Sequence, residues 1–293
     1  MQQLARRPHQ QLAAPRRSAA AARPRRRPPR AAGQEAQQQQ QPQQQQLVIT
    51  GDCFDDVVQQ LARRALDAAR ALPGPPALHV VGIAGAPGSG KSTLARAVAA
   101  AVNAQAAGAG LGRGAAVAPM DGFHLTRAQL DAMPDPQAAH ARRGAPWTFD
   151  GEAFVSALAA LRRSGAAALP SFDHALGDPV PGDAVIDAAR HAVVLVEGNY
   201  LLLRDEPWAA LRPLLDDTWF VECPLDVAMA RVIARQTAPD IGLTPAQSAA
   251  RVAGNDRPNA ELVAACRGDA RVLVPSTVPL TRERGGGGDA ARR

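Results

Sequence analysis

The feature that most constrains the fold of this chain is the glycine-rich stretch GAPGSGKS at residues 85–92. It fits the pattern G-x-x-x-x-G-K-[ST], the Walker A phosphate loop, whose glycines let backbone N–H groups turn inward around phosphate oxygens. Lys91 is the only lysine in a chain that otherwise takes its positive charge from arginine. Because a lysine carries a compact ammonium on a thin stem, it suits a tight loop better than the wide arginine fork does.

The sequence on either side supplies the strand and the helix that such a loop requires. Residues 78–84 (LHVVGIA) are an apolar run of buried-strand type, and residues 92–105 (STLARAVAAAVNAQ) indicate a helix. A helix that starts at the loop presents its positive N-terminal end to bound anions. The alternative is a glycine-rich turn that joins an ordinary strand to a helix.

Apolar runs and helical stretches alternate along the rest of the chain. Four further runs indicate strands, at residues 115–120, 191–196, 218–222 and 271–275. A β–α alternation of this kind favours a parallel sheet with helices on both faces. Together with the Walker A loop, it predicts an α/β, three-layer P-loop NTPase fold with a mostly parallel five-stranded sheet and a helical lid.

The predicted P-loop domain comprises residues 77–282, and the segments on either side of it differ from it in composition. Residues 47–76 form a lead-in whose helix spans residues 54–72 and stops at the sequence PGPP. We expect residues 1–46 to be a disordered Arg/Gln-rich extension and residues 283–293 a disordered tail. Three isolated cysteines without a C-x-x-C pair indicate a reducing compartment and no structural zinc. No apolar run approaches the roughly 18 residues of a membrane span.

The N-terminal extension carries the excess positive charge. Residues 1–46 hold nine arginines and one acid, Glu35, a net +8, whereas the rest has 24 basic against 26 acidic residues, a net −2. No nucleic-acid partner is therefore expected for the folded domain. An Arg-rich, acid-poor N-terminus is typical of a transit peptide, which predicts a chloroplast or mitochondrial location. The alternatives are a disordered extension or wrongly assigned start codon on a cytoplasmic protein, or an RNA-binding arm.

Carboxylates follow two of the predicted strands, at the sheet edge where ligands of such folds bind. Asp121 comes after residues 115–120, and Glu197 comes after residues 191–196. Acids in these places can hold Mg²⁺ directly or through water, or accept a proton from an attacking hydroxyl. The alternatives are a turn-forming aspartate before glycine and an ordinary acid at a strand end.

A later segment has the properties of a hinged lid. Arg231 and Arg235 are four residues apart in DVAMARVIAR and so project from one helical face, and Arg251 follows in a second helical stretch. Phosphoryl transfer needs cations around the moving group, and a closing lid would bring them there and exclude water. Solvated surface arginines are the alternative.

These segments resemble the phosphoribulokinase/uridine kinase family of P-loop kinases, within it the uridine kinase-like branch, which is related to pantothenate kinase. The resemblance covers roughly residues 77–277 in the family's order. PMDGFHL and RRGAPWTFD are specific to the branch, whereas Walker A is widely shared. The matching segments are GAPGSGKST (85–93), PMDGFHL (119–125), RRGAPWTFD (142–150), PSFDHALGDPVP (170–181), VEGNYLLL (196–203), WFVECPLDVAMARVIAR (219–235) and NDRPNAELV (255–263).

The resemblance implies a role for each of the candidate residues. Asp121 falls where such kinases place the base that takes the proton of the substrate hydroxyl. Glu197 is the Walker B-like acid, and with Ser92 it lies near Mg²⁺. Lys91, Arg231 and Arg235 complete the implied catalytic set. The residues implied to bind the ATP phosphates are Gly85, Gly88, Ser89, Gly90, Lys91, Ser92 and Thr93.

The resemblance also implies an acceptor pocket, with weaker candidates. Arg143 and His174 lie in segments that border it, and Trp147 and Phe149 are able either to stack on a flat substrate or to fill the core. Gln236 departs from the family pattern, because family lids usually have a basic residue there, often His. We therefore expect a lid of reduced charge.

We expect an ATP- and Mg²⁺-dependent kinase that acts on a hydroxyl of a small molecule: a nucleoside, a sugar or sugar acid such as glycerate, or a pantothenate-like metabolite. No membrane partner is expected, and a homodimer is left open. The alternative function is a nucleotide-binding regulatory protein with slow ATP hydrolysis. Both acids and the lid arginines speak against it, because binding alone does not require them.

Overall fold

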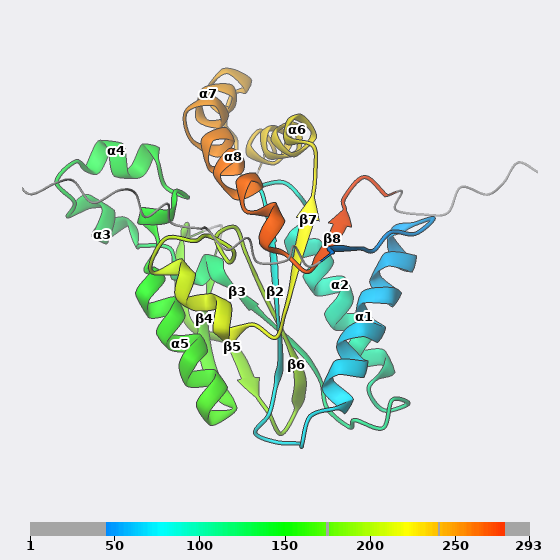
Figure 1. Cartoon of the computed structure of the whole chain (residues 1–293). Coiled ribbons are helices and arrows are strands. Elements are labelled where there is room, and N and C mark those ends of the chain that lie inside the picture. The colour runs from blue at the N-terminus through cyan, green and yellow to red at the C-terminus, as the bar shows by residue number, and fades with distance from the viewer. Residues whose placement is uncertain (1–44, 174–175, 240, 279–293) are drawn as a thin grey trace, which may run out of the picture. The chain divides into compact units, whose positions relative to one another are not determined.

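The computed structural model describes residues 45–173, 176–239 and 241–278, and at their centre lies a six-stranded sheet (Figure 1). Every neighbouring pair of strands is parallel, in the order β1-β8-β7-β2-β6-β3. The predicted α/β fold with a mostly parallel sheet is confirmed, and all five predicted strands are present. The strands are β1 (Leu47–Val48), β2 (His79–Gly85), β3 (Gly114–Pro119), β6 (His191–Gly198), β7 (Asp217–Glu222) and β8 (Val272–Pro275).

The sheet has one strand more than predicted, and it comes from the lead-in segment. β1 pairs with β8, with Leu47 opposite Val272. A strand of two residues is too short to show a hydrophobic period, so the sequence pattern could not reveal it. The predicted helix of this segment is α1 (Phe54–Arg70), which ends two residues earlier than expected.

Buried apolar side chains fill both faces of the sheet, because alternate residues of a strand point to opposite faces. On one face, Val81 and Ile83 of β2 pack with α1 and with α2 (Lys91–Gln105). On the other face, Val80 and Ala84 share a core with α5 (Gly151–Ser164) and the 3₁₀ segment η3 (Trp208–Leu214). Helices thus cover both faces of the sheet and give the three predicted layers (Figure 1).

A two-stranded antiparallel hairpin, β4 (Ala166–Asp173) with β5 (Asp178–Asp187), forms a separate sheet that contacts β3 of the main sheet, and it was not predicted. The prolines in these two segments argue against strands when only the sequence is considered. Pro170 lies in β4 at the point where the register shifts, and β5 contains Pro179 and Pro181. Proline cannot donate to a ladder, but a two-stranded sheet has only edge strands, where it is tolerated.

The chain after β7 forms a helical subassembly, residues 225–265, which we call the lid (Figure 1). It consists of α6 (Leu225–Gln236), α7 (Pro245–Arg251), the π-helical segment η4 (Val252–Asp256) and α8 (Arg257–Ala265). The remaining elements are η1 (Met120–Phe123), α3 (Arg127–Asp131), α4 (Pro136–Ala141), η2 (Pro146–Thr148) and η5 (Arg267–Asp269).

Gln236, the departure from the family pattern, lies buried inside the lid. Its Nε2 donates to Asp256 Oδ2 at 3.0 Å, and its Oε1 accepts from Ser248 Oγ at 2.8 Å. The amide therefore joins α6 to α7 and η4. A neutral group suits this place, because a buried charge costs far more than a hydrogen-bonded amide.

Several predictions concern residues outside the described ranges and stay predictions. They are the transit-peptide assignment of residues 1–46, of which 1–44 are not described, the predicted C-terminal tail at residues 283–293, and a substrate contact by His174. Within the described ranges, no helix has both the length and the apolar character needed to cross a membrane.

Candidate active site

The Walker A loop joins the carboxyl end of β2 to the start of α2. Gly88 and Gly90 adopt φ angles of 77° and 98°, which L side chains adopt only with strain. Lys91 is the first residue of α2, and its N-cap, Gly90, has no side chain to cap the helix. The first N–H groups of α2 are therefore left for an anion, as the motif predicts.

The loop also packs tightly against the lid. A Cβ atom added at Gly88 would lie 2.3 Å from the carbonyl oxygen of Ala228 in α6. Only glycine allows this approach of backbone to backbone. The contact fixes the first helix of the lid beside the loop.

The two predicted acids lie at the ends of neighbouring strands. β3 and β6 pair with Pro119 opposite Glu197, and Asp121 follows two residues later in η1. The Ser92 hydroxyl donates a hydrogen bond to Glu197 Oε2 at 3.0 Å. Burial raises the pKa of Glu197; Lys91 opposes that rise, and the charge of Asp121 adds to it. The fold thus brings Lys91, Ser92, Asp121 and Glu197 together.

The donor set at this place fits Mg²⁺. A serine hydroxyl and carboxylate oxygens are hard ligands, and Mg²⁺ usually takes one or two carboxylates together with substrate phosphates and water. Within the described part of the chain, no group of three or more His, Cys, Asp or Glu side chains could hold a metal by itself. A cation at Ser92 and Glu197 would therefore take its remaining ligands from phosphates and water.

The lid arginines differ in what they reach. Arg231 Nη1 lies 3.5 Å from the carbonyl oxygens of both Gly88 and Ser89, and its Nη2 lies 3.3 Å from the carbonyl oxygen of Ser276. Its guanidinium is therefore beside the phosphate loop. Arg235 is exposed one turn further along α6, so the structure brings one of the two predicted arginines to the loop.

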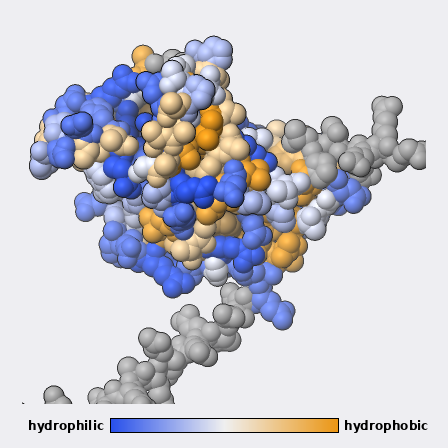
Figure 2. All heavy atoms as spheres, turned by 90° about the horizontal axis from the view of Figure 1, so that it is seen from above, coloured by the Kyte–Doolittle hydropathy of each residue, from blue (hydrophilic) through white to orange (hydrophobic). Residues whose placement is uncertain are grey.

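The face of the molecule seen from above carries both hydrophilic and hydrophobic residues. Seen from above, blue residues cover much of it, with smaller hydrophobic patches between them (Figure 2). Such a surface suits charged phosphates better than an apolar ligand.

Comparison with known proteins now decides the family. Residues 80–240, more than half of the chain, match the model of the Phosphoribulokinase / Uridine kinase family. The chain belongs to this family.

Individual members of the family and solved structures agree. The chain is 42% identical over 161 residues to an ATP-dependent kinase-like protein of Aspergillus versicolor. The alignment covers 53% of this chain and 93% of that protein. It is 38% identical over 186 residues to a Schizosaccharomyces pombe protein named provisionally as a uridine kinase, with coverage of 63% and 77%. These relatives place it in the uridine kinase-like, ATP-dependent P-loop kinase branch of the family.

Two solved structures share the fold. One, from Silicibacter sp. TM1040, is described provisionally as a fructose transport system kinase; it matches with a TM-score of 0.63 at 36% identity, over 74% of this chain and 98% of that one. The other, the P-loop kinase YFH7 of Saccharomyces cerevisiae, matches with a TM-score of 0.60 at 21% identity over the same shares. At that identity the second likeness shows the fold alone.

Arg143, which the family resemblance places at the acceptor pocket, uses its guanidinium to hold the hairpin. Nη1 donates to the carbonyl oxygen of Gly177 at 2.6 Å, and Nη2 donates to Leu125 O and to Asp178 Oδ1, both at 2.8 Å. Its Nε is buried without a partner among the described residues. The structure therefore assigns Arg143 a structural role, and a contact with substrate stays a prediction.

The two aromatic candidates separate clearly. Phe149 is buried, with its ring centroid 3.9 Å from that of His124 and 5.6 Å from that of Tyr200. It is a core residue. Trp147 is 49% exposed, so of the two it is the one with a ring surface free for a substrate.

Sequence reasoning missed Asn255, which links the lid to the RRGAPWTFD segment. Its side chain is almost completely buried; Nδ2 donates to Arg143 O at 2.9 Å, and Oδ1 accepts from Arg142 Nε at 3.3 Å. The sequence held one signal, because Asn255 opens the family segment NDRPNAELV. The structure adds that it lies in a π-helical segment, a type of distortion frequent at functional sites.

Tyr200 was missed in the same way. It follows Glu197 in the segment VEGNYLLL, and its hydroxyl donates a hydrogen bond to the carbonyl oxygen of Gly144. Burial raises the pKa of this hydroxyl, so it stays protonated and keeps the bond. Asn255 and Tyr200 thus hold residues 143 and 144 from two sides.

Proposed function

We propose that this kinase transfers the γ-phosphate of ATP, in the presence of Mg²⁺, to a hydroxyl group of a small metabolite. The candidate acceptors are a nucleoside, a sugar or sugar acid, and a pantothenate-like alcohol. The proposal keeps the roles that the family resemblance implies and adds the contacts that the structure gives them.

The observation that carries the proposal is the placement of two acids beside the phosphate loop in different surroundings. Glu197 is buried and accepts the Ser92 hydroxyl, which is the arrangement of an acid on the Mg²⁺ side. Asp121 is only half buried, and its carboxylate accepts no hydrogen bond from the described residues. One acid is therefore engaged, and the other is left for a substrate.

In the proposed reaction, Asp121 orients the acceptor hydroxyl and takes its proton as the oxygen attacks the γ-phosphorus. The bond from that phosphorus to the bridging oxygen breaks, and ADP leaves with the electron pair. Lys91 and the N–H groups of the loop hold the phosphates, and Arg231 offsets the charge that develops between them. Ser92 and Glu197 would hold Mg²⁺, which would supply positive charge against the phosphates.

The names of the relatives favour two of the acceptor classes. The S. pombe relative is named provisionally as a uridine kinase and the Silicibacter structure as a fructose transport system kinase, which supports a nucleoside or a sugar. The exposed ring of Trp147 is able to stack on a base, because aromatic faces pair well with flat heterocycles. We give nucleosides the first place in the screen.

The test is an ADP-release assay on the full chain with Mg-ATP and a panel of nucleosides, sugars, glycerate and pantothenate. We expect one compound to stimulate ADP release and to gain one phosphate by mass. Each hit is repeated with Asp121→Asn, which should bind ATP and release no ADP above background. ATP binding without phosphorylated product across the whole panel would contradict the proposal and support a nucleotide-binding regulatory protein instead.

A further inference from the structure

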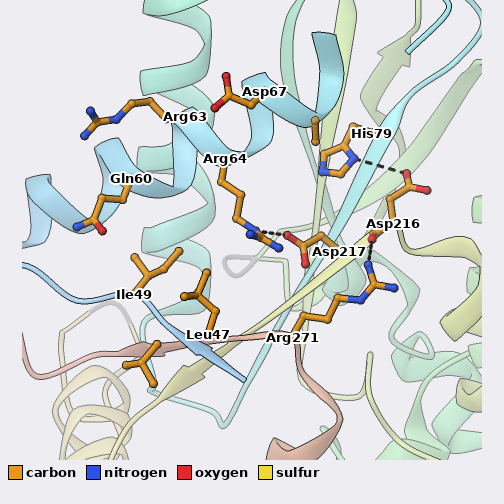
Figure 3. Close-up of a pocket in the computed structure, with 12 residues that line it drawn as sticks. Leu47, Ile49, Gln60, Arg63, Arg64, Asp67, His79, Asp216, Asp217 and Arg271 are labelled. Atoms are coloured by element: carbon orange, nitrogen blue, oxygen red, sulfur yellow. Dashed lines mark hydrogen bonds and ion pairs between the residues drawn. The ribbon is translucent and has the colours of Figure 1, made fainter. Parts of the chain in front are cut away.

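A cavity lies at the opposite edge of the sheet, where β2, β7 and β8 begin, and we call it the amino-edge cavity (Figure 3). Its volume is about 740 Å³, within the range of about 300–1,000 Å³ that is usual for sites of small organic ligands. Arg64 reaches into it from α1, His79 lies at the start of β2, and Arg271 comes from the residue before β8. None of these residues belongs to the active site described above.

Three carboxylates line this cavity, and each is already paired with donors of the protein; Asp67 accepts from Arg70 Nη1 at 2.6 Å. Asp217 accepts from Arg64 Nε at 2.6 Å, from Trp219 Nε1 at 2.8 Å and from the N–H of Thr218. Asp216 accepts from the N–H of Val80 at 2.8 Å and from both Nη groups of Arg162, at 2.7 and 3.0 Å. These acids therefore offer little to a cation.

The arginines, in contrast, have donors to spare. Arg64 uses only its Nε, on Asp217, and Arg271 uses only its Nη1, on the backbone carbonyl of Asp216. The other guanidinium nitrogens of both residues make no hydrogen bond to the described part of the chain. Because a guanidinium carries five N–H donors, both arginines keep donors available for an acceptor in the cavity.

His79 provides an independent sign of a missing partner. The residue is 7% exposed, and its Nε2 is buried with no hydrogen bond among the described residues. Its Nδ1 lies 3.9 Å from Asp216 Oδ2, which is too far for a hydrogen bond. A buried ring nitrogen without a partner costs free energy, and the described residues supply none.

We propose that this cavity binds a phosphate monoester, with the phosphate group at the free guanidinium donors of Arg64 and Arg271. A phosphate offers more acceptor oxygens than a carboxylate does, and guanidinium forks suit it well. The carbon part of the ligand would lie against the apolar side of the cavity, which Leu47, Ile49 and Ala68 form. The proposal does not depend on the kinase reaction, because it uses none of the residues of the active site.

The test measures binding of glycerol 3-phosphate to the full chain by calorimetry and by the rise in melting temperature, with glycerol as the uncharged comparison. We expect glycerol 3-phosphate to bind and glycerol not to bind. Arg271→Gln should weaken binding by about tenfold, the usual effect of removing a charge-assisted hydrogen bond. Arg64→Lys is a second variant that keeps the charge beside Asp217 but removes the fork, and it should weaken binding as well.

Two controls locate the ligand. Arg163→Gln changes an exposed arginine of α5 that does not line the cavity, and it should bind like the wild type. Lys91→Ala disables the phosphate loop. This variant should also bind the ligand like the wild type if the ligand occupies the amino-edge cavity. Three results would overturn the proposal: no binding at millimolar ligand, unchanged binding by Arg271→Gln, or loss of binding in Lys91→Ala. None of them depends on finding the acceptor of the kinase.

Discussion

The two ends of one strand, β2, lead into two charged regions that are built in different ways. At its carboxyl end β2 runs into the Walker A loop, where backbone N–H groups and Lys91 face the place of the phosphates. At its amino end β2 begins at His79, beside arginines that come from α1 and from the residue before β8 (Figure 3). The first region is mostly backbone, and the second is mostly side chain.

This difference explains why one region is visible in the sequence and the other is not. A backbone site needs glycines and a helix start in consecutive positions, so it leaves a motif. The amino-edge cavity is assembled from residues 64, 79 and 271, which are far apart along the chain and have no shared pattern. Only the folded topology brings them together.

Among the substitutions that test this comparison, we expect the largest loss of turnover from Asp121→Asn, at the carboxyl edge of the sheet. The amide keeps the shape of the side chain but cannot take the acceptor proton, so turnover should fall by about 10²–10⁴-fold. ATP affinity should stay the same, because the phosphate loop is unchanged. The measurements are turnover by ADP release and ATP binding by calorimetry. Asp183→Asn, at an exposed position of β5, is the matched control. Wild-type turnover by Asp121→Asn would show that the base is assigned wrongly.

Most of the fold could be predicted, because it rests on long periodic segments. The buried strand before the loop, the helix after it and the order of the other strands all follow from local hydrophobicity. β1 and the hairpin β4–β5 could not be found in this way. β1 has only two residues, and the hairpin carries prolines that argue against strands when the sequence is read alone.

The sequence predicts which residues lie at the candidate site better than it predicts the contacts that these residues make. The shared position of Asp121 and Glu197 could be predicted because acids that follow parallel strands lie at one edge of the sheet. Two sets of hydrogen bonds depend on segments that only the tertiary fold brings close. They are those of Arg143 to Leu125, Gly177 and Asp178, and those of Asn255 to residues 142 and 143. Sequence spacing carries no information on such contacts.

A second prediction compares a cation at each edge. Lys91→Arg places a wider group on a longer stem in the tight loop, and we expect turnover to fall by about 10²-fold, as for loss of one essential electrostatic contact. Arg271→Lys is the reciprocal exchange at the amino edge, and kinase turnover should be unchanged. Both are measured by ADP release. Full activity of Lys91→Arg would show that the only lysine of the chain is not required at that position.

The third prediction concerns the backbone packing of the carboxyl edge. Alanine at Gly88 or Gly90 has to adopt a positive φ angle, which costs about 1–2 kcal/mol at each. At Gly88 the new Cβ also meets the carbonyl oxygen of Ala228, whereas at Gly90 it meets nothing within 4 Å. Gly88→Ala should therefore lower the free energy of unfolding by about 2 kcal/mol more than Gly90→Ala. Urea unfolding measures both, and equal losses would show that the loop does not rest on α6.

The smallest effect is expected from His79→Gln at the amino edge, and it depends on pH. Burial lowers the pKa of His79 in the folded chain below its ordinary value of 6.5; Asp216 and Asp217 oppose this shift, and Arg64 and Arg162 add to it. Between the two pKa values the unfolded chain binds more protons than the folded one, so stability is lost as the pH falls below about 6.5. A single proton contributes at most about 1.4 kcal/mol per pH unit to this slope.

His79→Gln removes the titrating group and should make the free energy of unfolding depend less steeply on pH just below 6.5, as measured by urea unfolding on both sides of that value. The slope should be reduced and not abolished, because burial also lowers the pKa of His191 at the start of β6. Bound phosphate sharpens the comparison, since a negative charge beside His79 favours the protonated ring and should flatten the wild-type slope in the same direction. An unchanged slope in His79→Gln would mean that the ring nitrogen already has a partner and that the amino edge is not poised for an anion.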